Sequence, residues 1–418
     1  MRKTFLALIA VLSLIPSPEA AAKTVEEVLK EKGVITEEEY KQITPSPTYG
    51  YAPGKGFTLT SADRNFQLSL GGRGQFQYQF IDKETGQDVS QFRIRRFKVY
   101  MGGYAFTSDL TYRVQADLTK SNTAQLLDDA WINYRFADEA QAQAGQFKVP
   151  FLREELISDG AQQFVDRANV VDAFKPSYDI GVMGWGNVSK GLFAWSAGIF
   201  GGAGQGQTRT GNNSAYAIRA AFNPLGAVPY TESALENYEN PRFSIGGDYF
   251  WNTLKRNVPN STFQDTSSST PPYAGTSGWL GNSTNAAVFD NTEKVDVEMY
   301  SVDAALKWRG LSAQAEYMRG SSEGEVTGRT VKSSGMYAQA GYLIIPKHLE
   351  VAGRYTWYDP RDHVSNDLVT QAQGAVSWYF YAHNLKVQGD YTNIHTQKGA
   401  GKPATDDHQV RLQAQVTF

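Results

Sequence analysis

From Phe66 to the end of the chain, apolar and polar side chains alternate with a period of two. In FQLSLGGRGQFQYQF, residues 66–80, phenylalanine, leucine and tyrosine fall on one face, whereas glutamine, serine and arginine fall on the other. Residues 408–418, HQVRLQAQVTF, repeat this alternation and end on Phe418. Successive side chains of a strand point to opposite faces. Strands with one apolar and one strongly polar face are typical of a barrel that has lipid outside and water inside.

The alternation predicts about sixteen strands, an even number that is large enough to enclose an aqueous channel. Short turns such as Arg309-Gly310 are expected at the periplasmic end, and long polar stretches such as residues 252–291 at the outer end. We therefore predict an all-β fold, a transmembrane antiparallel β-barrel over residues 57–418. The strands are expected near residues 66–80, 92–106, 108–118, 127–136, 139–149, 178–186, 192–200, 214–222, 242–251, 295–308, 311–318, 335–344, 348–358, 370–380, 384–391 and 408–418.

A short helical segment is predicted before the barrel. Residues 24–43 read as two helices, and Thr36 and Glu39 at the start of the second have the spacing of a capping box. The proline- and glycine-rich residues that follow are typical of a linker. We expect residues 23–56 to form a periplasmic helical segment and linker, which either packs against copies of itself or acts as a solvated tether.

The N-terminus has the order of a secretory signal peptide. Met1-Arg2-Lys3 precedes an apolar run, and Ala20-Ala21-Ala22 supplies small residues for cleavage. We expect residues 1–22 to be removed on export and the mature protein to lie in the outer membrane. The apolar run is too short to cross a bilayer as a helix, and no later stretch offers roughly 20 consecutive apolar residues. A helical membrane protein is therefore excluded.

Composition agrees with a barrel and argues against nucleic-acid binding. Mean hydropathy is −0.43 and 13% of the residues are aromatic, as expected where only alternate residues face lipid and aromatic girdles flank the apolar band. Without cysteine, the fold must be closed by backbone pairing. Removing residues 1–22 takes Arg2, Lys3 and Glu19 from 40 basic and 43 acidic side chains and leaves 38 and 42. This balance lacks the basic footprint of a nucleic-acid-binding protein.

Two regions combine basic side chains with a position that can narrow a pore. Residues 92–103 carry Arg93, Arg95, Arg96 and Lys98. Residues 145–186 form a long insertion between strands that is a candidate for a loop folded into the barrel, and this insertion contains Lys148, Arg153 and Arg167. Arginine and lysine in a narrow throat attract anions, and arginine offers paired donors to phosphate oxygens.

The direction of these basic side chains is open from the sequence. Arg93 and Arg95 share a face with Phe97 and Val99, so either a β-bulge shifts the alternation or one pair of arginines sits at the membrane rim. Pairing with a carboxylate of the lumen, such as Asp117 or Asp129, is a further alternative. Later strands place acidic and basic residues together on the polar face, which favours a weakly selective general porin. The acidic ones are Asp248, Asp303, Glu316, Glu350 and Asp390.

Four motifs carry a family resemblance: RIRR (93–96), DDAWINY (128–134), GQFKVPF (145–151) and YDIGV (178–182). With them the chain resembles the phosphate-selective porins O and P of Gram-negative bacteria. The resemblance implies a trimeric barrel of about sixteen strands whose eyelet of arginine and lysine selects anions such as phosphate. It assigns the eyelet to Arg93, Arg95, Arg96, Lys98, Arg113 and Lys148.

Two other classes of protein were weighed against a porin. For an outer-membrane hydrolase, all five histidines lie at or after His348, and no Ser-His-Asp or metal-ligand spacing emerges. A structural or adhesion barrel would have a plugged lumen. The sequence favours a porin for passive diffusion of small hydrophilic solutes, with no catalysis, cofactor or metal. Its expected partners are outer-membrane lipid, small anionic or polar solutes and two further copies in a homotrimer.

Overall fold

The structure is a computed structural model. The predicted signal peptide and most of the second predicted helix lie outside the residues that it describes. The described residues are 25–36, 39, 47–120, 125–207, 213–257, 262–263, 288–290, 293–398 and 403–418.

The N-terminal segment contains helix α2 (Val25–Glu31). Beyond it, the amide N of Thr36 donates to Oε2 of Glu39 at 2.7 Å, and the amide N of Glu39 donates to Oγ1 of Thr36 at 3.1 Å. These reciprocal bonds are those of the predicted capping box. No helix in the described part of the chain is long and apolar enough to cross a membrane.

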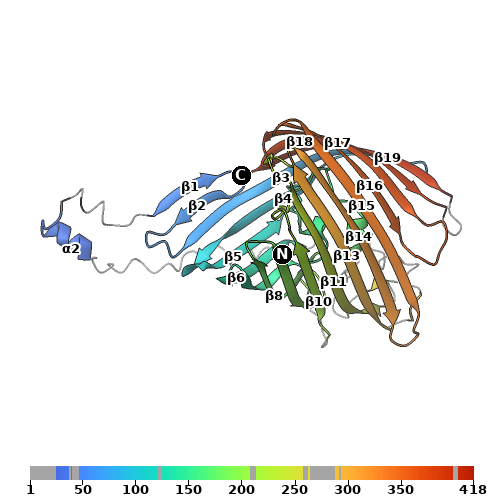
Figure 1. Cartoon of the computed structure of the whole chain (residues 1–418), viewed down its shortest axis with the longest axis horizontal. Helices are drawn as coiled ribbons and strands as arrows, with labels where there is room; N and C mark the ends of the chain where they lie inside the picture. The colour runs from blue at the N-terminus through green and yellow to red at the C-terminus, as the bar shows by residue number, and fades with distance from the viewer. Residues whose placement is uncertain are drawn as a thin grey trace, which may run out of the picture. The chain divides into compact units, whose positions relative to one another are not determined.

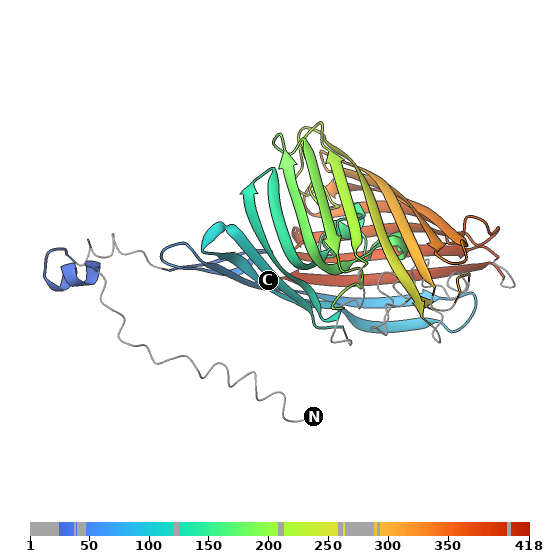
Figure 2. The ribbon, with the colours of Figure 1, turned by 90° about the horizontal axis from the view of Figure 1, so that it is seen from below.

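Within the described residues, sixteen antiparallel strands close into a barrel. Consecutive strands pair along the chain, and the last strand pairs with the first from His408↔Asp82 to Thr417↔Arg73 (Figures 1 and 2). This closure pairs the first and last barrel strands with each other, so neither is a free edge along that span. The strands are β3 (Gln67–Asp82), β4 (Val89–Ala105), β5 (Thr107–Asp117), β6 (Leu127–Ala137), β7 (Ala140–Lys148), β8 (Tyr178–Val188), β9 (Phe193–Phe200), β10 (Ala215–Phe222), β11 (Arg242–Asn257), β13 (Lys294–Trp308), β14 (Leu311–Gly324), β15 (Thr330–Ile345), β16 (Leu349–Asp359), β17 (Val369–Tyr381), β18 (Leu385–Thr396) and β19 (Thr405–Thr417).

Three short strands add to the barrel wall. The two-residue strand β12 (Thr262–Phe263) pairs with the end of β11. Strands β1 (Thr48–Ala52) and β2 (Gly56–Thr60) form a hairpin, and β2 pairs with β3. The sequence predicted a linker up to residue 56, so this prediction was wrong for the hairpin. Gly54 and Gly56 have φ values of 77° and 76° and allow the tight turn between the two strands.

Apolar and polar side chains lie on opposite faces of the barrel wall, as the alternation predicts. Large apolar side chains point outward, such as Phe92, Ile132 and Val182, which are 86%, 58% and 55% exposed. Polar side chains such as Gln75 and Gln415 point inward and bond to each other. Apart from residues 223–241, long loops and short turns lie at opposite ends of the strands, which identifies the outer and periplasmic ends.

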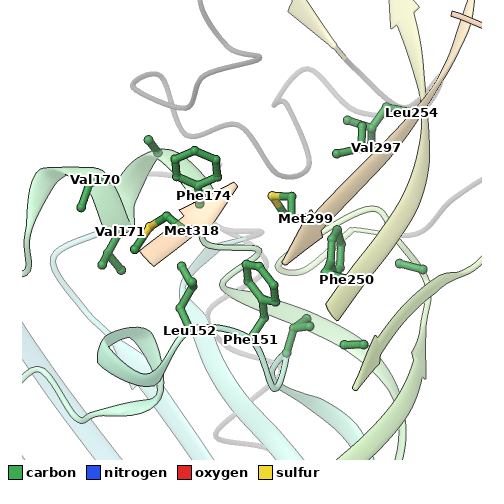
Figure 3. Packing of buried hydrophobic residues seen from close by; sticks show 14 of the residues in the cluster. Phe151, Leu152, Val170, Val171, Phe174, Phe250, Leu254, Val297, Met299 and Met318 are labelled. Carbon is green, nitrogen blue, oxygen red and sulfur yellow. The ribbon is translucent and has the colours of Figure 1, made fainter. Parts of the chain in front are cut away.

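The insertion after β7 folds into the barrel, as expected of residues 145–186. Its residues 149–177, here called the inward loop, contain helices α4 (Arg153–Leu156) and α5 (Asn169–Phe174) and are mostly buried. Apolar side chains of the loop pack against inward-facing apolar residues of β11, β13 and β14 (Figure 3). This dry cluster was not predicted, because the sequence reading assigned polar residues to the whole inner face. Its labelled members are Phe151, Leu152, Val170, Val171, Phe174, Phe250, Leu254, Val297, Met299 and Met318.

A second segment enters the barrel from the periplasmic end. Residues 223–241, here called the inward turn, connect β10 to β11 and bury Val228, Ser233 and Ala234. Its Glu232 amide N donates to the carbonyl oxygen of Ala161 at 3.0 Å. A second hydrogen bond joins the two segments, because the amide N of Gln163 in the inward loop donates to Oε2 of Glu232 at 2.6 Å. The two inward segments therefore meet inside the barrel.

Candidate functional site

A β-bulge in β4 settles the direction of its basic side chains. The register between β3 and β4 pairs Gln75 with Arg96 and then Phe76 with Ile94, so Arg95 is an extra residue on β4. Such a residue shifts the alternation of the strand by one position. Ile94 is 53% exposed and points outward, whereas Arg96 is 8% exposed and points inward. The bulge, rather than a place at the membrane rim, therefore sets the direction of these side chains, and pairing with a lumen carboxylate also occurs, between Arg113 and Asp129.

The β4 cations meet two carboxylates of the inward loop. Asp166 lies 3.1 Å from Arg95 and 3.2 Å from Arg96. Asp159 lies 3.0 Å from Arg96 and 2.9 Å from Lys98. Arg93 stands slightly farther off, with its guanidinium 3.9 Å from Asp166 and its Nε donating to Gln77 at 2.5 Å.

These ion pairs keep both loop carboxylates charged. Burial alone would raise the pKa of Asp159, but Arg73, Lys98 and Arg96 outweigh it and hold that pKa well below its usual range. Burial likewise opposes ionisation of Asp166, and nearby arginines, Arg95 first among them, hold its pKa below the usual range. The loop is therefore fastened to β4 by charged groups at neutral pH.

Next to these pairs lies a cavity of about 390 Å³, here called the outer cavity. Among the described residues, eight basic and four acidic side chains line it, an excess of four positive charges when all are ionised. Six of the eight are predicted site residues. The basic ones are Arg93, Arg95, Arg96, Lys98, Lys120, Lys148, Arg167 and Lys175, and the acidic ones are Asp117, Asp128, Glu155 and Asp159.

Lys120 and Lys175 were missed by the sequence reading. Lys120 follows β5 and pairs with Asp128 at 2.8 Å, whereas Lys175 follows α5 and pairs with Asp172 at 2.6 Å. Lys175 lies within residues 145–186 but was not singled out there, and Lys120 lies beyond the basic stretch of residues 92–103.

Lys148 and Arg167 both donate hydrogen bonds to backbone carbonyl oxygens near the start of the inward loop. Arg167 Nε donates to the carbonyl oxygen of Glu154 at 3.1 Å and lies 3.2 Å from Oε2 of Glu155. The ammonium of Lys148 donates to the carbonyl oxygens of Glu155 and, at 3.3 Å, of Ile157. No carboxylate in the described part of the chain forms an ion pair with Lys148. Its hydrogen-bond partners are carbonyl oxygens, and its Nζ lies 5.9 Å from the centre of the Tyr178 ring.

Two predicted site residues lie elsewhere. Arg113 is 3.6 Å from Asp129 and lies 4.7 Å above the ring of Tyr100, away from the outer cavity. Strand β5 carries it toward the periplasmic end, because it pairs with Gly102 rather than with the region of the bulge. Arg153 is 1% exposed and donates to the carbonyl oxygen of Pro229 in the inward turn at 3.2 Å. Neither arginine lines the outer cavity with the β4 cations.

A second cavity of about 510 Å³, here called the inner cavity, lies toward the periplasmic end. Lys148, Arg153 and Arg219 line it, and no acidic side chain of the described residues does. Much of its remaining wall is apolar, with Leu156 and Met183 among the lining residues. Lys148 lines both cavities and so marks the point where they adjoin.

On the opposite wall, acidic side chains hold the inward loop. Asp248, Asp303 and Glu316 bring ligand atoms within 4.8 Å of one another. Carboxylates of this kind bind metal ions, yet here Arg219 lies 2.6 Å from Asp248 and 2.7 Å from Asp303. The amide N of Arg153 donates to Glu316 at 2.7 Å. Arginine and backbone amides therefore occupy the place that a metal cation would take beside these carboxylates.

Further buried pairs extend this anchoring along β16, β18 and β19. Arg354 lies 3.1 Å from Glu154. Side-chain Nε2 of Gln163 donates to Glu350 at 2.6 Å. The amide N of Val165 donates to Asp390 at 3.0 Å. The acidic residues that the sequence placed on the lumen face do point inward, and they contact the loop.

Comparison with known proteins agrees with this architecture. The family model described as phosphate-selective porin O and P matches residues 68–418. An uncharacterized protein of Aquifex aeolicus (strain VF5) is 25% identical over 306 residues, which cover 68% of this chain and 66% of that relative. The alignment thus spans just under two thirds of the relative's length.

Two solved porins share the fold. The anion-selective porin from Comamonas acidovorans has a TM-score of 0.57 at 9% identity, covering 84% of this chain and 99% of that one. Salmonella typhi OmpF, solved in complex with daunomycin, has a TM-score of 0.54 at 14% identity, covering 89% and 100%. At these identities the likeness is one of fold alone.

Proposed function

This chain belongs to the phosphate-selective porin O and P family, and from that premise we propose that its outer-membrane channel favours small anions, phosphate among them. The proposed route runs from the outer cavity past Lys148 into the inner cavity and on to the periplasm. Solutes cross it by passive diffusion. We further propose that the working unit is a homotrimer, as the family resemblance implies.

The observation that carries the anion preference is the charge of the outer cavity. Its lining has twice as many basic as acidic side chains. In a narrow site with low-dielectric walls, an excess of one charge raises the local concentration of the opposite ion. Arginine adds paired donors that match phosphate oxygens. Arg93 and Arg95 retain about a third of their side-chain surface exposed, so their guanidinium groups remain accessible.

Reversal potentials in planar bilayers with a KCl gradient test this proposal. The wild-type channel should favour chloride, and added phosphate should reduce the chloride current. Lys148→Gln should lower the chloride preference several-fold, because Lys148 lines both cavities. Arg329→Gln is the matched control, since that side chain is 59% exposed and pairs with Asp290 outside the barrel strands.

A weakly selective general porin is the second candidate. It is favoured by the four carboxylates that line the same outer cavity. Equal permeability to potassium and chloride in the wild type, with no effect of phosphate, would select this candidate. Cation preference would contradict the anion proposal and leave the porin assignment intact.

A further inference from the structure

The inner cavity differs in chemistry from the outer cavity. The lining of the outer cavity is almost wholly charged and polar. The inner cavity combines three cations with aliphatic, sulfur and aromatic side chains, including Leu156, Met183 and Trp185. An inorganic anion would gain nothing from that apolar wall. A mostly apolar site with a few placed polar groups is the usual form of a site for an organic molecule.

Two of the three cations, Arg219 and Arg153, are held in place by neighbouring side chains. Arg219 pairs with Asp248 and Asp303, and its Nε donates to the hydroxyl of Tyr230 at 3.1 Å. The guanidinium of Arg153 lies 5.0 Å from the centre of the same ring. Tyr230 belongs to the inward turn, so this segment both closes the cavity on one side and fixes the two arginines.

Lys148 supplies the third cation from a different direction. It stands where the outer cavity adjoins the inner one, and its described partners are carbonyl oxygens of the inward loop. An anion entering from the outer cavity would meet this ammonium first. Its apolar part would then lie against the wall formed by the loop and β8, where Leu156 and Met183 are found.

We propose that the inner cavity is a transit site for small organic anions that carry one carboxylate on an apolar body. This inference rests on the proposed anion channel and names a substrate class for it. The carboxylate would be held by Lys148 with support from Arg153 and Arg219. The apolar body would be held by contact with the aliphatic and aromatic wall, at roughly 25 cal/mol per Å² of surface removed from water.

The probes are benzoate and acetate, which have the same charged group and differ in apolar surface. Each is titrated against the single-channel KCl current of the full-length protein in planar bilayers. Benzoate should reduce the current at a concentration at least about fivefold below that of acetate. Phosphate serves as an inorganic reference, because it can interact with the cationic side chains but has no apolar part to contact the wall.

Two variants test the apolar wall. Met183→Gln and, separately, Leu156→Asn roughly keep side-chain length and add polarity, so each should raise the half-blocking concentration of benzoate at least about threefold. Neither should change the phosphate effect or the KCl reversal potential. Val326→Gln is the matched control, because it makes the same kind of change at a side chain that is 80% exposed and lines neither cavity. Using two variants guards against one of them failing to fold.

The proposal is overturned if benzoate is no more effective than acetate in the wild type. It is also overturned if the correctly folded variants keep the wild-type ratio of benzoate to acetate. Failure of the proposed anion preference would give a different result. The reversal potential in a KCl gradient would then favour cations before any organic anion is added.

Discussion

The two sides of the barrel interior use their charges in different ways. On the side formed by β4 to β10, basic side chains line two cavities, and one of them, Lys148, lines both and donates hydrogen bonds to carbonyl oxygens. On the side formed by β11 to β19, buried side chains such as Arg354 and Glu350 bind the inward loop. Inward-facing ionisable residues of both sides contact the inward loop, yet the two cavities lie along the first side.

This difference between the two sides shows why the number of charged side chains in the lumen is a poor guide to the ion selectivity of the channel. Asp248 and Asp303 point inward, but Arg219 and the loop amides take up their charge. A carboxylate neutralised in this way acts weakly on an ion that passes on the opposite side of the barrel. The acidic residues of the later strands therefore do not argue against anion preference.

The largest expected effect comes from releasing the loop. Arg354 and Glu154 form a pair with no exposed side-chain surface. Arg354→Met leaves Glu154 buried without its partner, which should lower the free energy of unfolding by about 3–5 kcal/mol. Urea unfolding in detergent measures this loss, and a larger conductance should accompany it. Arg329→Met, which removes an exposed pair, should have almost no effect on either quantity.

A matched pair of charge removals compares the two sides directly. Arg96→Gln removes a cation from the outer cavity and takes one of several partners from each of Asp159 and Asp166. It should reduce the ratio of anion to cation permeability several-fold. Lys386→Gln removes a cation whose Nζ donates to the carbonyl oxygen of Gln162 on the far side. Its reversal potential should match the wild type, and a large shift would contradict the division into two sides.

The pH dependence of the loop contacts has a definite sign. The pKa of Asp166 is held below its unfolded value near 3.9. A carboxyl with a lowered folded pKa contributes stability above its unfolded pKa and loses it as pH falls through the folded pKa. The stability difference between wild type and Asp166→Asn should therefore stay constant from about pH 7 to 5 and shrink below about pH 4. Thermal unfolding in detergent checks this, and shrinkage near neutral pH would be inconsistent with it.

The smallest effect is expected for Arg113. Because its side chain pairs with Asp129 and stacks on Tyr100 outside the outer cavity, Arg113→Gln should leave the reversal potential within error of the wild type. An effect as large as that of Arg96→Gln would restore Arg113 to the eyelet.

The barrel strands were predictable because their signal is local. Alternation places β13 near 295–308 in the sequence and at Lys294–Trp308 in the structure. Predicted strands are too short where the inner face turns apolar. Strand β11 continues to Asn257 rather than ending near 251, because Leu254 packs in the dry cluster and the contrast between faces disappears there.

The site was less predictable because it depends on contacts between distant parts of the chain. The sequence identified six of the basic residues of the outer cavity, but their direction depends on a bulge at Arg95 that alternation alone leaves open. The path of the inward loop decides that Arg153 faces the inner cavity. The entry of the inward turn, with Tyr230 behind the arginines, had no local signal.

The most direct test of the two-sided interior uses the absence of cysteine from the chain. Ser196→Cys places a thiol in the inner cavity, and Ser377→Cys places one on the far side at a position that is 2% exposed. The measurement is the rate at which an anionic methanethiosulfonate reagent modifies each thiol and lowers the single-channel current. A pathway along β4 to β10 predicts rapid modification of Ser196→Cys and none of Ser377→Cys; equal rates, or modification of Ser377→Cys alone, would contradict it.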